Sequence, residues 1–245
     1  ALSAAASDVY KRQLLTLMNL LCGSFAVVVA LMYNDLTLAF WLIVAGIVFD
    51  FFDGFVARLL HSSSAIGVQL DSLADVITSG LAPAAVLWQV CLQTEPCWLP
   101  ETWKLGYGVF VLAAFSALRL AKFNIDETQT VEFCGLPTPA GSLLCASLGM
   151  LWQQGAVALS SDGVLLIAVL TSLLLVSPIR MFALKFHGFG WRGNEVRYLF
   201  LLASIVLIII LRTYAIPVII VLYIVVSAVR WLCMRSGNPD KAPKA

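Results

Sequence analysis

Residues 36–58 read LTLAFWLIVAGIVFDFFDGFVAR, and this stretch sets the class of structure that the chain can form. Residues 36–49 carry no charged side chain. The whole stretch has about the length of the roughly 20 apolar residues that a helix needs to cross a bilayer. Two aspartates, Asp50 and Asp53, stand where the apolar run ends. The stretch therefore predicts a transmembrane helix with carboxylates near one membrane surface.

The composition of the whole chain also indicates a membrane protein. Of the 245 residues, 61% are hydrophobic and 12% are charged, and the mean hydropathy is +0.94. A soluble domain has about 25% charged residues, and a disordered chain needs low hydrophobicity with high net charge. Both classes are therefore excluded. The net charge of +1 argues against a nucleic-acid partner, because such a partner calls for a basic surface.

Further apolar segments are bounded by polar residues, glycines or prolines. Together with the first they are Leu14–Tyr33, Leu36–Arg58, Val68–Leu92, Leu105–Ala121, Ala140–Leu159, Val164–Arg180, Tyr198–Leu211 and Ala215–Trp231. The last two meet at Arg212, which we place in a turn at the membrane surface because a buried arginine is costly. We expect an all-α fold, a polytopic integral membrane bundle of about eight transmembrane helices. The membrane domain would comprise residues 14–233, between a cytoplasmic segment (1–13) and a polar tail (234–245).

The distribution of cationic residues predicts the orientation. Eight spans place both termini on one side, and all but two of the 15 Lys and Arg residues then fall on that side. The exceptions are Lys104 and Arg212. Because such cations accumulate in cytoplasmic segments, we expect both termini in the cytoplasm. Cys91 and Cys97 bracket a loop on the opposite side, and whether they pair depends on how oxidising that compartment is.

Four aspartates fall at helical spacing in the second and third segments. Asp50 and Asp53 are three residues apart and Asp71 and Asp75 are four apart, so each pair shares one helix face. A short connection predicts that the two faces meet as antiparallel neighbours. Four such carboxylates in a membrane cost on the order of 10 kcal/mol without compensation. Clusters with oxygen ligands alone suit Mg²⁺, Mn²⁺ or Ca²⁺.

Two other interpretations of these aspartates remain open on physical grounds. The carboxylates can lie solvated in a cytoplasmic loop without a function, although their helical spacing argues against this. A cation or proton-coupled transporter is the stronger competitor, because acidic residues inside membranes also line ion pathways.

The same region follows the pattern D-x2-D-G-x2-A-R-x8-G-x3-D-x3-D, and here the chain resembles the CDP-alcohol phosphotransferases. Every fixed position is matched, by Asp50, Asp53, Gly54, Ala57, Arg58, Gly67, Asp71 and Asp75. The flanking segments, from about Thr16 to about Tyr198, are most similar to bacterial members that use L-serine as acceptor. The resemblance implies a divalent-metal-dependent enzyme of the bacterial inner (plasma) membrane, with its active site near the cytoplasmic face. It would transfer the phosphatidyl group of CDP-diacylglycerol to the serine hydroxyl and release CMP.

The resemblance further implies two divalent cations, Mg²⁺ or Mn²⁺, on the four aspartates. Asp50 and Asp71 would bridge both ions, and Asp53 would hold the first. Asp75 would bind the second ion and remove the proton from the serine hydroxyl. This division of roles is chemically reasonable, since a neutral hydroxyl is a poor nucleophile and paired cations polarise a phosphoryl group.

The remaining candidate residues would bind the two substrates. For CDP-diacylglycerol they are Thr16, Asn19, Gly54, Ala57, Arg58, Ser64 and Gly67. Thr16 and Asn19 are equally well explained as polar contacts between transmembrane helices. The serine carboxylate requires a cation, and the candidate acceptor residues are Arg119, Lys122, Asn124 and Arg180. The two arginines can instead be charges that set the orientation of helix ends.

Some features of the acceptor and partners stay open. Gly135-Leu-Pro137-Thr-Pro139 is a simple helix start, part of the acceptor pocket or a loop that gates lipid entry. Glycerol 3-phosphate or inositol phosphate are alternative acceptors, but a phosphorylated acceptor needs several clustered cations near the metals. The expected partners are the two substrates and the lipid bilayer, with no nucleic acid. Members of the family often pair through their helices, so a homodimer is a further expectation.

Overall fold

The computed structural model of the protein describes residues 2–59, 65–97, 106–125, 132–182 and 194–237. Its helices and strands are α1 (Leu2–Val28), α2 (Leu36–Leu59), α3 (Ala65–Asp75), α4 (Ala82–Gln93), α5 (Val111–Ile125), β1 (Glu132–Cys134), α6 (Thr138–Gln153), α7 (Ser161–Leu175), β2 (Arg180–Phe182), α8 (Glu195–Leu211) and α9 (Ala215–Gly237). Two π-helical turns, Val29–Tyr33 and Val76–Leu81, extend α1 and join α3 to α4. Two 3-10 turns, Gly106–Phe110 and Arg212–Tyr214, precede α5 and α9. The fold class is therefore helical, as predicted.

Five helical stretches among the described residues are long and apolar enough to cross a membrane. They are Gln13–Tyr33, Leu36–Ala57, Ile66–Gln93, Gly106–Ile125 and Glu195–Cys233, the last of which contains both α8 and α9. The chain is thus a helical membrane protein by the length and composition of its helices. The helices α6 and α7 have 16 and 15 residues and are shorter than the segments predicted for them.

The seventh helix ends earlier than the sequence predicted. The expected segment ran to Arg180, but α7 stops at Leu175 and Arg180 lies in strand β2. Pro178 explains the difference, because a proline disfavours helical backbone in the residue before it. The strands β1 and β2 form an antiparallel ribbon in which Cys134 lies opposite Arg180. Within the described residues, this ribbon is the departure from the all-α expectation.

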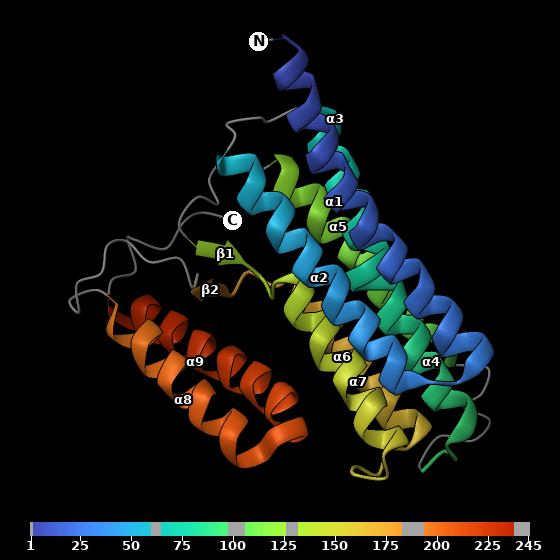
Figure 1. Cartoon of the computed structure of the whole chain (residues 1–245). Coiled ribbons are helices and arrows are strands. Elements are labelled where there is room, and N and C mark those ends of the chain that lie inside the picture. Colours follow the sequence, from blue (N-terminus) through green and yellow to red (C-terminus); the bar gives the residue numbers. More distant parts are fainter. Residues whose placement is uncertain (1, 60–64, 98–105, 126–131, 183–193, 238–245) are drawn as a thin grey trace.

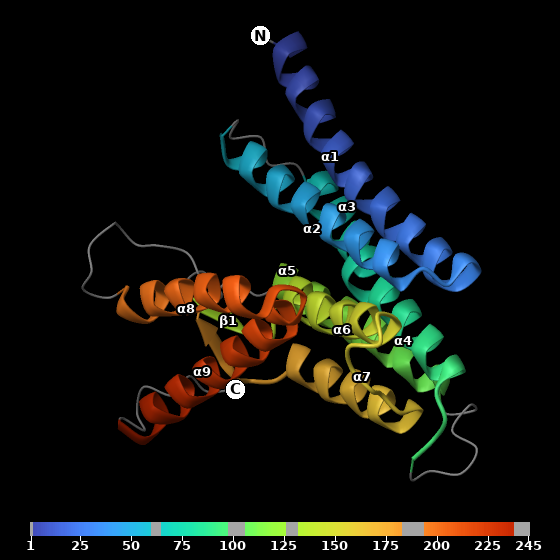
Figure 2. The same ribbon diagram turned by 60° about the horizontal axis from the view of Figure 1, so that its bottom comes forward.

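The helices form a bundle with a separate hairpin at one side. In Figure 1, α1 and α2 run side by side in front of α3, α4 and α5, and α6 and α7 follow. The hairpin of α8 and α9 turns at Arg212–Tyr214, as the sequence predicted, and its α9 packs on α6 and β2. Figure 2 shows that the hairpin diverges from the main bundle. The ribbon of β1 and β2 thus connects the bundle to the hairpin.

The core lies between the helices, and the outer surface is strongly apolar. Phe40, Leu87, Leu112 and Met150 are among the large side chains that are almost fully buried. Helix α8 exposes most of its apolar residues, including Ile209, which is 72% exposed. Lipid tails are as apolar as these side chains, so such a surface is stable inside a bilayer. The buried polar residues therefore stand out as candidates for function.

Candidate active site

The four aspartates come together from two helices. Asp50 and Asp53 lie on the C-terminal part of α2, and Asp71 and Asp75 lie on α3. The carboxylate of Asp50 is within hydrogen-bonding reach of Asp71 and within electrostatic range of Asp53 and Asp75. The carboxylate of Asp75 is within range of Asp71 and Asp53. The two acidic faces that helical spacing predicted therefore meet at one place.

The helices that carry them are held together mainly by α1. Helix α1 packs extensively against both α2 and α3, whereas α2 and α3 make few close backbone approaches. The two acidic faces thus meet through side chains such as Asp50 and Asp71, while the backbones of α2 and α3 stay further apart. Repulsion between carboxylates disfavours close packing of two acidic faces, while α1 presents neutral polar groups to both.

Two polar residues of α1 hold two of the aspartates. The hydroxyl of Thr16 donates a hydrogen bond to Asp53 Oδ2, and Asn19 Nδ2 donates to Asp75 Oδ1 at 3.0 Å. Thr16 and Asn19 are both buried, and so is Asp53. Charge-assisted hydrogen bonds of this kind orient a carboxylate as well as stabilise it. The interpretation of Thr16 and Asn19 as interhelical polar contacts is supported, with carboxylates of the acidic cluster as their partners.

The position of Asn19 is fixed by a close contact between α1 and the π-helical turn that follows Asp75. The hydroxyl of Thr78 donates to the backbone oxygen of Asn19 at 3.0 Å. A Cβ atom at Gly23 would lie 2.7 Å from Thr78 Cα, and one at Gly46 would lie 2.6 Å from Thr78 Cγ2. The two glycines therefore allow the third span to approach α1 and α2 closely. The π-helical turn at this point is a feature that often occurs at functional sites.

The aspartates fit a divalent cation in the chemistry of their donor atoms. All four offer carboxylate oxygens, the preferred ligands of Mg²⁺ and Mn²⁺, and each lies close to at least one other. Asn19 Oδ1 is a further buried oxygen, and it has no hydrogen-bond partner among the described residues. As placed, however, no three His, Cys, Asp or Glu side chains within the described ranges form a ready metal centre. The four carboxylates are thus suitable ligands in their chemistry, and they lie next to one another beside α1.

The small residues predicted to receive CDP-diacylglycerol flank this cluster. A Cβ atom at Gly54 would meet nothing within 4 Å, so this side of α2 is open. Ala57 is half-buried on the same helix, and Gly67 is buried on α3. The side chain of Arg58 and all of Ser64 lie outside the described residues. Gly54 is thus the position where this helix face is open, and the contact of these small residues with CDP-diacylglycerol stays a prediction.

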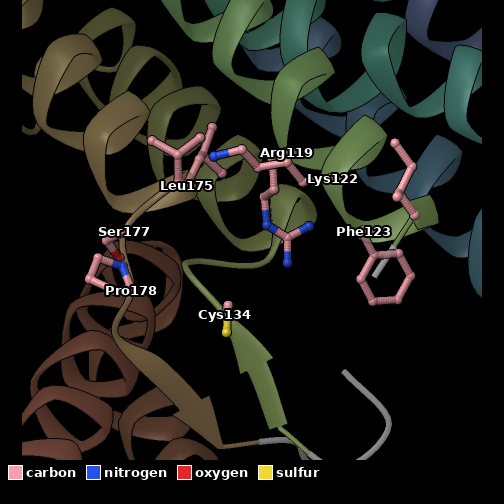
Figure 3. Close-up of a pocket in the computed structure, with 9 residues that line it drawn as sticks. Arg119, Lys122, Phe123, Cys134, Leu175, Ser177 and Pro178 are labelled. Carbon is pink, nitrogen blue, oxygen red and sulfur yellow. The ribbon is translucent and has the colours of Figure 1, made fainter. Parts of the chain in front are cut away.

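A cavity of about 390 Å³ lies beside the candidate acceptor residue Arg119. Its lining comes from the end of α5, the end of β1, and the last residue of α7 with the segment after it: Arg119, Lys122, Phe123, Ile125, Cys134, Leu175, Val176, Ser177 and Pro178. Figure 3 shows the guanidinium of Arg119 directed into this space above Cys134. Arg119 is also within electrostatic range of Asp75. The cavity therefore has a cationic wall that adjoins the acidic cluster.

The other candidate acceptor residues differ in position. Lys122 lines the cavity, but Asn124 does not and instead donates to Ser72 Oγ at 2.8 Å on the exposed side of α3. Arg180 lies in β2 opposite Cys134, which lines the cavity. Arg119 and Lys122 thus line the same cavity. Arg180 lies next to it, on the strand that pairs with Cys134, and Asn124 lies apart from all three.

Two residues that the sequence did not single out take part in the site. Thr78 holds Asn19, and Thr138 accepts a hydrogen bond from Arg119 Nη1 at 3.0 Å. The spacing of the aspartates carries no signal for either residue, because their contacts join different helices. Thr138 does lie inside the Gly135–Pro139 segment, for which a role in the acceptor pocket was left open. Its contact with Arg119 supports that second interpretation.

The two cysteines of the opposite loop do not pair. Cys91 and Cys97 are both free, with Cys91 buried and Cys97 exposed. The thiol of Cys91 donates weakly to the backbone oxygen of Ser161 at 3.6 Å, and the backbone NH of Cys97 donates to Asp162 Oδ2 at 2.8 Å. Hydrogen bonds to the start of α7 therefore anchor this part of the chain.

The fold, the acidic cluster and the adjoining cationic cavity together define a membrane-embedded phosphotransferase. The family model described as CDP-alcohol phosphatidyltransferase matches residues 13–177, and the chain belongs to this family. The match runs from Gln13, within α1, to Ser177, just after α7, and so includes all four aspartates and Arg119.

The curated relatives point to one branch of this family. A CDP-diacylglycerol--serine O-phosphatidyltransferase of Bacillus subtilis is 32% identical over 71% of this chain and 91% of its own length. The protein of the same name from Helicobacter pylori is 30% identical over 89% of this chain and 90% of its own. One from Mycobacterium tuberculosis is 33% identical over 94% of this chain and 82% of its own. The match to a family of enzymes displaces the transporter interpretation.

Proposed function

We propose that the chain transfers the phosphatidyl group of CDP-diacylglycerol to the hydroxyl of L-serine, which yields phosphatidylserine and CMP. The observation that carries this proposal is the position of Arg119. Its guanidinium is directed into a cavity and is within electrostatic range of Asp75 in the acidic cluster. A carboxylate-bearing acceptor bound there would have its hydroxyl near the reacting group. The names of the relatives agree with serine as that acceptor.

Asp50, Asp53, Asp71 and Asp75 would hold two divalent cations, Mg²⁺ or Mn²⁺. The donor atoms support this assignment, since all are carboxylate oxygens and they adjoin one another. The bound cations would polarise the phosphoryl group and stabilise the negative charge on the leaving CMP. Thr16 and Asn19 support the cluster from α1 by donating hydrogen bonds to Asp53 and Asp75.

Asp75 would act as the base. Its carboxylate accepts the proton of the serine hydroxyl, and the serine oxygen then forms a bond to the phosphorus that carries diacylglycerol. The bond from this phosphorus to the oxygen of CMP breaks, and CMP leaves with the bonding electron pair. Asn19 supports this role because its hydrogen bond fixes Oδ1 of Asp75, and Oδ2 would then accept the proton.

The donor lipid would lie along the face of α2 that is open at Gly54, with Ala57 half-buried one turn further on. Gly67 and Arg58, which occupy fixed positions of the family pattern, would complete this site, and Ser64 would be a further donor contact. On the acceptor side, the cavity offers Arg119 for the serine carboxylate and Lys122 as a second cation. This is a small set of cations for a phosphorylated acceptor and favours an amino acid.

We further propose that the membrane domain crosses the inner membrane in about eight spans with both termini in the cytoplasm. The short helices α6 and α7 lie within the bundle and α8 and α9 form an antiparallel hairpin, which supports this count. The cationic residues would then place the aspartates near the cytoplasmic face, where serine arrives from water. The homodimer remains an expectation from the resemblance.

The test is CMP release by the purified protein in detergent with CDP-diacylglycerol and Mg²⁺ or Mn²⁺. L-serine, glycerol 3-phosphate and inositol phosphate are supplied separately. We expect CMP release that requires both the cation and L-serine. Release with a phosphorylated acceptor alone would overturn the assignment of serine, and release without any cation would overturn the role of the aspartates.

A further inference from the structure

The guanidinium of Arg119 is held by one neutral side chain. Arg119 is 8% exposed, and its Nη1 donates to the hydroxyl of Thr138 at 3.0 Å. Its Nε is buried and has no hydrogen-bond partner among the described residues. An unpaired buried donor is costly, so its retention in a cavity wall points to a ligand that accepts from it.

The hydroxyl of Thr138 is available for this contact because it does not cap its own helix. Thr138 begins α6, whose N-cap position is Pro137, and no side chain caps this helix end. Thr138 is 1% exposed, so its hydroxyl is directed into the protein interior and not toward water. A buried hydroxyl needs partners, and the guanidinium of Arg119 supplies a charged one.

The backbone around Thr138 is fixed by the end of α7 and the segment that follows it. The backbone NH of Gly135 donates to Ile179 O, and that of Leu136 donates to Leu174 O, both at 2.9 Å. Gly135 has a φ of +77°, and a Cβ atom there would lie 2.2 Å from Leu175 O. Only glycine fits this turn without strain. The hydrogen-bonded turn therefore fixes the backbone that places the Thr138 hydroxyl next to Arg119.

We propose that Thr138 is a positioning residue that orients Arg119 for the carboxylate of the acceptor. This inference rests on the proposed function, in which Arg119 binds the serine carboxylate. A guanidinium has five donors in one plane, and anchoring Nη1 leaves the edge formed by Nε and Nη2. That edge can bind a carboxylate through two parallel hydrogen bonds. Thr138 thus selects which edge of Arg119 is presented to the cavity.

Steady-state kinetics of Thr138→Val, which keeps the shape but removes the hydroxyl, tests this role. We expect the KM for L-serine to rise about tenfold or more, while the KM for CDP-diacylglycerol changes less than about twofold. Thr138→Ser keeps the hydroxyl and is expected to retain the wild-type KM for serine. Thr171→Val is the matched control, because it removes a buried threonine hydroxyl from α7 outside the cavity lining.

A double-mutant cycle separates positioning from a merely structural role. If Thr138 acts through Arg119, Thr138→Val adds little to the serine KM of Arg119→Lys, because the geometry that it maintains is already lost. Full additivity of the two changes would overturn the proposal. So would a wild-type serine KM in Thr138→Val, or an equal rise in Thr138→Ser. Failure of the wild-type protein to use serine at all would instead overturn the proposed function, so the two failures are distinguishable.

Discussion

The side-chain amide of Asn19 donates a hydrogen bond at 3.0 Å to Asp75, a residue 56 positions later in the chain. The backbone oxygen of the same asparagine accepts from Thr78, so Asn19 is held on both sides. Its α1 neighbour Thr16 contacts Asp53 in the same way. Helix α1 therefore organises the acidic cluster without contributing a carboxylate to it.

Loss of the Asn19 amide should lower turnover. We expect Asn19→Ala to reduce kcat by about 100-fold, because misplacement of a base by about 1 Å has effects of this size. The KM for CDP-diacylglycerol should change much less. Ser24→Ala on the same helix is the control, since its hydroxyl donates to Leu20 O within α1 and contacts no aspartate among the described residues. CMP release measures both variants, and an unchanged kcat in Asn19→Ala would remove Asn19 from the catalytic arrangement.

Replacement of the proposed base should abolish turnover and spare lipid binding. Asp75→Asn keeps the shape of the side chain but cannot accept the serine proton at neutral pH. We expect kcat to fall by at least about 100-fold. Binding of CDP-diacylglycerol, measured by the retention of radiolabelled lipid, should stay close to wild type because three aspartates remain. Wild-type turnover in this variant would assign the base to another residue.

Thr16 should affect the requirement for divalent cation. Thr16→Val removes the hydroxyl that bonds to Asp53, and loss of such outer contacts lowers metal affinity by about 10-fold to 100-fold. The concentration of Mg²⁺ for half-maximal activity should therefore rise, and saturating Mg²⁺ should restore kcat. Titration of Mg²⁺ into chelator-treated protein checks this. The same midpoint as wild type would show that Thr16 does not act on the cation site.

Alanine at Gly23 should lower the stability of the protein, whereas alanine at Gly54 should not. Gly23→Ala places a methyl group 2.7 Å from Thr78 Cα, so we expect a loss of about 1–3 kcal/mol in the free energy of unfolding. Gly54→Ala meets nothing within 4 Å and should leave stability unchanged or slightly raised. Unfolding in detergent followed by circular dichroism compares them. Equal destabilisation by both changes would contradict the close contact of α1 with Thr78.

Removal of the Arg119 guanidinium, the proposed partner of the serine carboxylate, should weaken the binding of serine far more than that of the lipid. Arg119→Ala should raise the KM for L-serine by about 100-fold, as expected for the loss of a charged pair in a buried site, and the KM for the lipid much less. Kinetics at varied serine and fixed lipid measure the effect. An unchanged serine KM would place the acceptor elsewhere, and Arg180 in strand β2 would be the next candidate.

The fold class and the acidic cluster could both be predicted from the chain. Apolar runs of membrane-crossing length identify helices without reference to their neighbours. They located α2, the α8–α9 hairpin and the apolar stretch Gln13–Tyr33 closely, although α1 itself begins earlier, at Leu2. The spacing of Asp50 and Asp53, and of Asp71 and Asp75, is a property of single helices. Such local patterns survive folding because the backbone hydrogen bonds of a membrane helix close within one segment.

The end of α7 and the neighbours of the aspartates could not be predicted in the same way. The apolar pattern continues to Ile179, and it was Pro178 and the pairing of β2 with β1 that ended the helix. Likewise, carboxylate repulsion and the packing of α1 against both α2 and α3 are outcomes of the assembled bundle. A hydropathy pattern contains neither kind of information.

Apolar length and acidic spacing in the chain thus established a helical membrane protein with four aspartates on two helix faces. The packing of the helices decided which neutral side chain forms a hydrogen bond with each charged one: Thr16 with Asp53, Asn19 with Asp75 and Thr138 with Arg119. These pairs join different helices, with partners 37, 56 and 19 residues apart. Periodicity along one helix says which residues share a face. Packing between helices decides what that face meets.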